Sequence, residues 1–176
     1  MIYKDKIIKA MELLSKDNKV LFLGQTVAYQ GSLVYETLQK VPESKRIELP
    51  VMEDTQMGMS IGLSLEGFIP VSIYPRMDFL ILAMNQLVNH LDKIEKISHG
   101  QFKPKIIIRT MIGSRKPFYP GIQHCSDYTD ALKLILKDIK VIKLINSKDI
   151  IPAYKKALES NKSTLLIEMA DLYGEE

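Results

Sequence analysis

The sequence predicts an α/β fold, a three-layer sandwich in which helices cover both faces of a mostly parallel sheet. Short continuous apolar runs, such as Val20–Gly24, recur along the chain and are typical of strands buried on both faces. Segments with helical periodicity lie between these runs, and such alternation is typical of βαβ units. No repeat, linker or low-complexity tract interrupts the 176 residues, so we expect a single domain over residues 1–176.

The expected helices are recognised by apolar or small residues that recur every three or four positions. In the first helix Ile7, Met11 and Leu14 follow this spacing, and Asp17 lies just beyond its end. Pro42 lies just beyond the second helix, and Gly67 is the expected C-cap residue of the third. The expected helices cover residues 3–15, 31–40, 53–65, 77–97, 128–136 and 148–159.

The expected strands are short, apolar and rich in β-branched residues. They cover residues 20–24, 47–49, 69–73, 105–110, 141–144 and 164–168. Residues 111–126 contain two prolines and two glycines and are expected to form a loop of 16 residues. Long loops in compact domains are usually functional, so this loop is a candidate for substrate contacts.

Composition and charge exclude several classes of protein. The formal net charge is +3, and the lysines are interspersed with acidic residues, which is typical of a solvated surface and not of a nucleic-acid-binding stripe. No apolar run approaches the roughly 20 residues that span a bilayer, and the first residues lack a signal-peptide pattern. The single cysteine, Cys125, fits a reducing compartment. We therefore expect a cytoplasmic protein that binds neither membrane nor nucleic acid.

Glu53 is the most informative residue of the sequence. It follows an expected strand and begins a helix in which Gly58 and Gly62 lie four positions apart, with Ser60 and Ser64 half a turn away. Glycine inside a helix costs roughly 1 kcal/mol relative to alanine, so this pattern indicates that another backbone approaches closely. A carboxylate at the start of such a helix is a candidate for chemistry near a partner surface.

The common ligand-binding motifs are absent from the sequence. It contains no G-x-G-x-x-G, no G-x-x-x-x-G-K-[ST] and no G-x-S-x-G. His90, His99 and His124 are not at metal-ligand spacing from one another or from Cys125, so no metal site is expected.

Taken singly, the remaining candidate residues have ordinary structural interpretations. Glu53 alone would be a carboxylate stabilised by the helix dipole, and Phe79 alone would be a core residue. His124 alone would be a solvated loop histidine, and Arg109 alone would form a surface ion pair.

A set of short motifs in one order changes these interpretations. They are Leu23-Gly24-Gln25, Tyr29-Gln30-Gly31, Leu49-Pro50-x-x-Glu53, Gly58-x-x-x-Gly62, Gly67-x-x-Pro70-Val71, Met77-Asp78-Phe79, Asn85-Gln86, Ile108-Arg109-Thr110 and Gln123-His124. This order resembles the pyrimidine-binding domain of the beta subunits of 2-oxo acid dehydrogenase decarboxylase components, which belong with the transketolase-like enzymes. The resemblance extends over roughly residues 15 to 175, and its specificity lies in the order of the motifs.

The resemblance implies that the chain binds the pyrimidine end of thiamine diphosphate. In the family, a carboxylic acid at the position of Glu53 hydrogen-bonds to N1′ of the cofactor and helps its 4′-amino group act as the base. Phe79 matches the aromatic residue that stacks on the pyrimidine, with Tyr74 as the weaker candidate for that role. His124 matches a histidine that faces the reacting end of the cofactor, and Gln25 occupies a cofactor-binding position usually held by glutamate.

The resemblance also implies a partner. The family holds the diphosphate and magnesium through a Gly-Asp-Gly…Asn segment on another domain, and no Gly-Asp-Gly occurs in this sequence. We therefore expect a diphosphate-binding alpha-type subunit as partner, with a homodimer of this chain inside a heterotetramer. The further C-terminal domain of the family's beta subunits is absent from the 176 residues.

The sequence departs from the family at three places. Gln25 is neutral, Asp54-Thr55 replaces a small residue and glycine, and the segment 115–120 is not glycine-rich. Arg115 and Lys116 could bind a carboxylate or a sugar phosphate, although a solvated basic pair is the more ordinary interpretation. Two kinds of enzyme remain open, a transketolase-like transferase and an oxidoreductase of the 2-oxo acid dehydrogenase type. A non-catalytic module that keeps the fold and the interface is the alternative.

Overall fold

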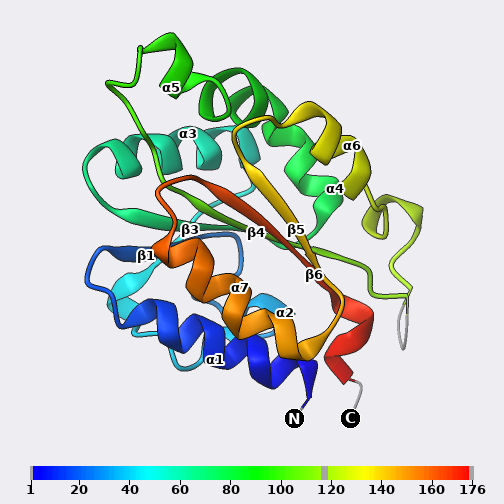
Figure 1. The fold of residues 1–176 in the computed structure, drawn as a ribbon. Coiled ribbons are helices and arrows are strands. Elements are labelled where there is room, and N and C mark those ends of the chain that lie inside the picture. Colours follow the sequence, from blue (N-terminus) through cyan, green and yellow to red (C-terminus); the bar gives the residue numbers. More distant parts are fainter. Residues whose placement is uncertain (1, 116–118, 175–176) are drawn as a thin grey trace.

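The computed structural model describes residues 2–115 and 119–174 and contains a six-stranded sheet in the order β2-β1-β3-β4-β6-β5 (Figure 1). Every pair of neighbouring strands in it is parallel, which confirms the predicted fold class. The strands are β1 (Val20–Gly24), β2 (Arg46–Glu48), β3 (Ile69–Tyr74), β4 (Ile107–Ile112), β5 (Lys140–Leu144) and β6 (Thr164–Met169).

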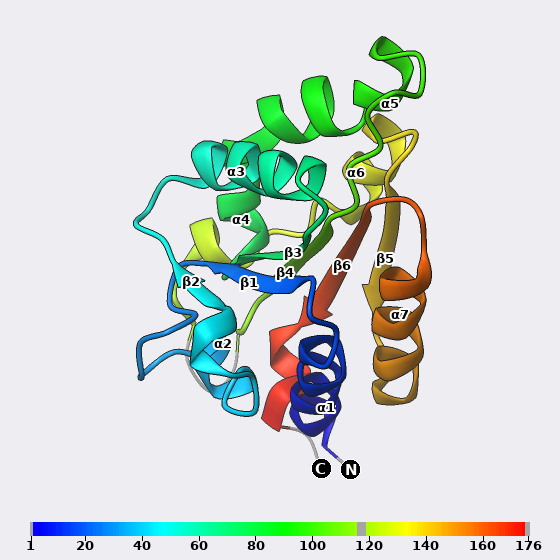
Figure 2. The same ribbon diagram turned by 90° about the vertical axis from the view of Figure 1, so that its left-hand side faces the viewer.

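Helices cover both faces of the sheet, as Figure 2 shows: α1, α2 and α7 on one face, α3 to α6 on the other. The helices are α1 (Tyr3–Ser15), α2 (Leu33–Thr37), α3 (Glu53–Leu65), α4 (Met77–Leu80), α5 (Ile94–Ile97), α6 (Thr129–Ile135) and α7 (Ser147–Glu159). Two apolar cores result, because successive side chains of a strand point to opposite faces. On β4, Ile107 and Met111 join the core beside α1, whereas Ile108 and Ile112 join the core beneath α3.

The prediction of one long helix over residues 77–97 is wrong. The chain forms α4, a 3-10 turn (Ile81–Ala83), a π-helical segment (Asn85–Leu91) and then α5. The reason lies at Asp92, whose buried carboxylate accepts hydrogen bonds from the amides of Lys137, Asp138 and Ile139 at 2.9–3.1 Å. The Asp92 amide in turn donates to the Leu87 carbonyl, five residues back, so the turn is widened where the helix is tied to another loop.

Several element boundaries also differ from the prediction, and at the starts of β4 and α2 side chains take over the terminal hydrogen bonds. Strand β4 begins at Ile107 and not at Lys105, because the Lys105 amide donates to Ser64 Oγ and the Ile106 amide to Ser163 Oγ. Helix α2 begins at Leu33, after Ser32 accepts the capping hydrogen bond.

Arg109 is fully buried, so the prediction of a surface ion pair is wrong. Its guanidinium binds both carboxylate oxygens of Glu168 on β6, at 2.8 and 3.0 Å, and also contacts Thr37 Oγ1 at 2.9 Å. The hydroxyls of Tyr154 and Tyr173 donate to the same carboxylate. Burial, followed by the charge of Glu168, raises the pKa of both tyrosines, so both remain protonated donors at neutral pH.

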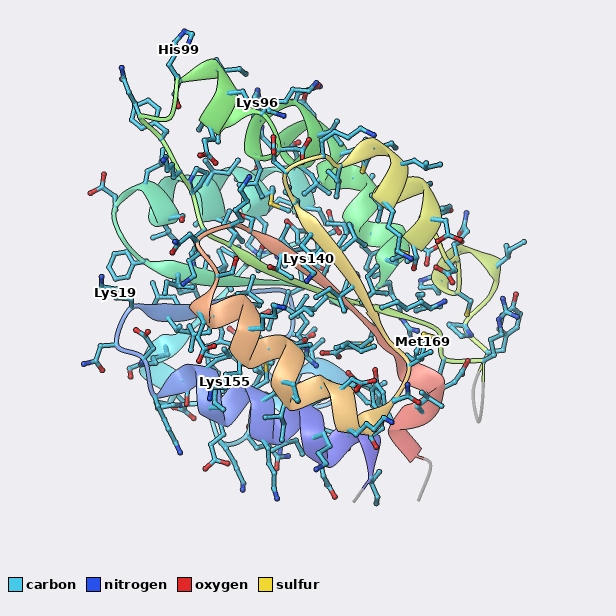
Figure 3. The ribbon with its side chains drawn as sticks, viewed as in Figure 1. Lys19, Lys96, His99, Lys140, Lys155 and Met169 are labelled. Atoms are coloured by element: carbon cyan, nitrogen blue, oxygen red, sulfur yellow. The ribbon has the colours of Figure 1, made fainter. Side chains whose placement is uncertain are left out.

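The lysines lie on separate parts of the surface. In Figure 3, Lys19, Lys96 and Lys155 occupy distant places on the outside of the domain, and all three are exposed. In the part of the chain that the structure describes, no helix has both the length and the apolar character required to span a membrane.

Candidate active site

The candidate site lies at the edge of the sheet where the strands end. From β1 the chain crosses to β2 on one side, and later to β3 on the other side of β1. In parallel α/β sheets, ligands bind outside the carboxyl ends of the strands at such a point of divergence. Gln25 follows β1 here, Glu53 follows β2, and Tyr74 is the last residue of β3.

Glu53 is the first residue of α3, and its side chain is buried, with 5% exposure. Gln25 Nε2 donates to Glu53 Oε1 at 3.1 Å, and the Tyr74 hydroxyl donates to the Glu53 backbone carbonyl at 3.3 Å. The structure therefore brings together three of the residues that the sequence singled out. A carboxylate that only complemented a helix dipole would lie in solvent, whereas this one is held against β1 and β3.

Gln56, one turn along α3, fixes the helix to the sheet. Its side-chain amide donates to the Ile73 carbonyl at 3.0 Å and to Ser72 Oγ at 3.1 Å. Gly24 makes this close packing possible, because a Cβ at that position would lie 2.3 Å from the Ile73 carbonyl oxygen. Sequence analysis missed Gln56; the available signal was a polar residue on the buried face of the glycine helix.

Glu48, at the end of β2, was also missed. Its carboxylate accepts hydrogen bonds from the amides of Thr26 and Ala28 at 2.6 and 2.8 Å. Thr26 has a φ of 58°, a conformation that a threonine rarely adopts. Glu48 therefore holds the loop after β1 in the shape that places Gln25 beside Glu53. The sequence signal that could have identified Glu48 was a charged residue between the apolar residues of an expected strand.

Phe79 and His124 form the second part of the site. Their rings lie 5.5 Å apart at 83°, an edge-to-face contact between α4 and the turn Ile122–His124. Two further contacts fasten this loop to α4: Asp78 accepts from the Ser126 amide at 3.3 Å, and the Tyr128 amide donates to the sulfur of Met77 at 3.0 Å. Phe79 and His124 line an open hollow of about 600 Å³.

Tyr74 lies beneath the site. Its ring is fully buried, and burial raises its pKa, so its hydroxyl stays protonated while it donates to the Glu53 carbonyl. Of the basic loop residues, Arg115 is exposed, and its backbone amide donates to Asp171. Lys116 lies outside the described residues.

The small-residue face of α3 divides into two parts. Gly58 faces the side chain of Gln86, whose amide carbon would lie 3.7 Å from a Cβ added at Gly58, an ordinary contact that an alanine would also make. Gly62 is exposed, and nothing lies within 4 Å of the place where its Cβ would stand. The neighbouring Met59 and Leu65 are exposed by 39% and 42%, so this end of α3 offers an apolar surface.

No protein-family model matches the chain. Curated relatives include the pyruvate dehydrogenase E1 component subunit beta of Gracilaria tenuistipitata var. liui, 26% identical over 172 residues, which are 93% of this chain and 50% of the relative. The subunit of the same name from Staurastrum punctulatum is 28% identical with the same coverage, and that of Mycoplasma genitalium is 25% identical over 168 residues. The chain spans about half the length of the curated relatives it matches.

Solved structures with the same fold include a split-gene transketolase described as an inactive beta4 tetramer. It superimposes with a TM-score of 0.73 at 18% identity, over 96% of this chain and 51% of that one. Transketolase from Leishmania mexicana gives a TM-score of 0.73 at 16% identity, over 94% of this chain and 25% of the other. Sequence and fold comparisons thus confirm the resemblance of this chain to the transketolase-like pyrimidine-binding domain found in 2-oxo acid dehydrogenase beta subunits.

Proposed function

We propose that the chain is the pyrimidine-binding subunit of a split thiamine diphosphate-dependent enzyme that acts on a ketose or a 2-oxo acid. The observation that carries the proposal is the buried Glu53 carboxylate, held by Gln25 at the carboxyl edge of the sheet. The curated relatives are named as beta subunits of a 2-oxo acid dehydrogenase component, and the solved structures are transketolases, which supports both substrate classes.

The described residues fit the pyrimidine end of the cofactor. Glu53 supplies the carboxyl group for N1′, and Phe79 offers a half-buried aromatic ring beside an open hollow of about 600 Å³. His124 has a buried Nδ1 atom with no hydrogen-bond partner among the described residues, as expected of a group that meets a ligand. When bound, thiamine diphosphate supplies a carbon nucleophile for attack on a carbonyl group.

Each protein group then has a distinct task. Glu53 holds a proton at N1′, and Gln25 orients the Glu53 carboxyl group through its side-chain amide. The Tyr74 hydroxyl holds the backbone of Glu53 by its hydrogen bond to the Glu53 carbonyl, and Tyr74 makes no contact with the cofactor in this proposal. His124 faces the reacting end and binds or protonates the substrate. Desolvation around these groups strengthens the hydrogen bond to N1′.

The proposal includes a partner. The described residues contain no group of three His, Cys, Asp or Glu side chains that could hold a metal ion. In this proposal magnesium and the diphosphate bind to an alpha-type subunit, and two copies of this chain pair inside a heterotetramer. A non-catalytic module is the second candidate, and the specific observation for it is the neutral Gln25 where the family has glutamate. Exchange of the cofactor C2 proton in the assembled enzyme distinguishes the two.

The isolated chain is expected to bind thiamine diphosphate negligibly, even with magnesium present. The diphosphate contributes most of the charge of the cofactor, and its anchor belongs to the proposed partner. Titration calorimetry on the purified chain checks this, with the same titration after addition of the partner subunit as the control. Tight stoichiometric binding by the chain alone would contradict the proposed division of the site.

Replacing Gly62 with leucine is expected to prevent self-association through α3. The substitution has room in the folded chain, because no atom lies near the added Cβ, and it removes a helix glycine that costs roughly 1 kcal/mol. A leucine there would hold two backbones apart. Analytical ultracentrifugation measures the effect, with Lys155→Leu on the exposed face of α7 as the matched control. An oligomer unchanged by Gly62→Leu would show that this interface is wrong.

A further inference from the structure

Along one edge of the sheet lie four buried polar atoms that have no hydrogen-bond partner among the described residues. They are Thr26 Oγ1, Arg76 Nη1, Thr110 Oγ1 and His124 Nδ1. Thr26 and Arg76 lie two residues beyond the ends of β1 and β3, Thr110 is paired in register with the last residue of β3, and His124 lies in the loop after β4. A buried polar group without a partner is destabilising, so such a concentration indicates a place where a ligand supplies the missing partners.

Arg76 is the only charged group among the four. Arg76 is half-buried. Its guanidinium forms no ion pair and no side-chain hydrogen bond with any other residue in the ranges 2–115 and 119–174. Arg109, by contrast, is buried with both oxygens of Glu168 in contact. Burying a guanidinium nitrogen without an acceptor is costly, so Arg76 Nη1 is placed to receive an anion from outside the chain.

Nearby carboxylates do not fill this role, because each has another partner. Glu48 binds the loop amides after β1, Glu53 binds the Gln25 side chain, and Asp78 binds the Ser126 amide. Asp127, further along the same loop, pairs with Lys143 at 2.5 Å. Among the described residues, Arg76 is thus left without a carboxylate partner.

Arg76 is also close in sequence to Phe79, one of the residues of the candidate site. It is the residue before α4, three positions and so about one helical turn before Phe79. The next two residues, Met77 and Asp78, hold the loop that carries His124. A ligand in the hollow that Phe79 and His124 line would therefore lie near the start of α4, where an arginine side chain can extend toward its anionic group.

We propose that Arg76 is an anion-binding residue of this site and that it binds the carboxylate of a 2-oxo acid substrate. The inference rests on the proposed function and chooses between its two substrate classes. The planar guanidinium fork matches the two oxygens of a carboxylate. In a 2-oxo acid the carboxylate is bonded directly to the reacting carbonyl carbon, so it lies beside the reacting centre. The phosphate of a ketose phosphate lies at the far end of the sugar.

The test uses the purified chain and the Nε–Hε signals of its arginines in ¹⁵N NMR spectra. Pyruvate and inorganic phosphate are titrated separately at constant ionic strength, with chloride as the reference anion. Arg76→Gln assigns the Arg76 signal and removes the guanidinium. Lys19→Gln is the matched control, because it removes the same charge at an exposed residue just before β1, at the opposite end of the sheet.

We expect pyruvate to change the chemical shift of the Arg76 signal in a saturable way, and at lower concentrations than phosphate. Arg76→Gln should weaken pyruvate binding by roughly tenfold or more, the usual effect of losing a charge-assisted hydrogen bond, and Lys19→Gln should leave it unchanged. Arg76→Lys should bind with intermediate affinity, which also shows that the position tolerates substitution.

Two results would overturn the proposal. If phosphate binds more strongly than pyruvate, the assignment to a carboxylate is wrong. If pyruvate does not bind, or binds equally well to the Arg76→Gln variant, Arg76 is not an anion-binding residue. The titration needs neither cofactor nor partner subunit. Its failure is therefore distinguishable from failure of the proposed function, which is tested by proton exchange at the cofactor.

Discussion

Replacing Glu53 with glutamine is expected to lower turnover of the assembled enzyme by roughly 10²–10⁴-fold, the usual range for loss of a general acid–base group. The amide has nearly the same shape as the carboxyl group and can still meet the Gln25 side chain, so folding and assembly should persist. It cannot exchange a proton with N1′ of the cofactor, and the reaction depends on that exchange.

Exchange of the cofactor C2 proton, followed by NMR in the assembled complex, separates this step from substrate chemistry. Glu66→Gln is the matched control, because Glu66 is an exposed glutamate at the other end of the same helix. If the Glu53→Gln enzyme exchanges the C2 proton at the wild-type rate, Glu53 has only a structural role at the start of α3. The non-catalytic interpretation of the chain would then be favoured.

Replacing Arg109 with methionine is expected to destabilise the domain by about 3–5 kcal/mol, the usual cost of removing one partner of a buried ion pair. The methionine would leave the Glu168 carboxylate charged and fully buried, with only the tyrosine hydroxyls as donors. Chemical denaturation with urea, followed by circular dichroism, measures the free energy of unfolding.

Two further variants show whether the loss of stability comes from breaking the buried ion pair. Lys155→Met removes an exposed pair with Glu159, whose charged atoms lie 3.8 Å apart, and should change stability by no more than about 0.5 kcal/mol. The double variant Arg109→Met with Glu168→Met should recover part of the loss, because no charge remains in the core. A loss below 1 kcal/mol for Arg109→Met alone, roughly that of an ordinary surface pair, would contradict the importance of this network.

The sequence predicted the layers of the fold because parallel strands buried on both faces give continuous apolar runs, as in Val20–Gly24. It failed at residues 77–97, where apolar residues recur at helical spacing although the chain changes its hydrogen-bonding pattern. Leu87 and Leu91 are buried as a helix would require. The widened turn depends on Asp92 meeting a loop 45 residues later, and no local pattern reports such a contact.

The site divides in a similar way. Glu53 was predictable because a strand end, a proline and a glycine-containing helix follow one another in the sequence. Arg109 was misjudged because its partner, Glu168, lies 59 residues away on a neighbouring strand. Glu48 and Gln56 were missed because their contacts depend on which strands become neighbours, and that order is set by the crossovers between strands.

The parallel sheet also determines how the chain reaches this structure. Val20 pairs with Ile69, 49 positions later, and Ile107 pairs with Thr164, 57 positions later. Such pairings require long loops to close, and the entropy cost of closure comes before the stabilising contacts form. Folding is therefore slow, and strand edges stay exposed while it proceeds. The carboxyl edge joins residues from β1, β2 and β3, so Gln25, Glu53 and Tyr74 meet only after two such crossovers are complete. A segment of the chain that lacks either crossover therefore cannot bring these three residues together.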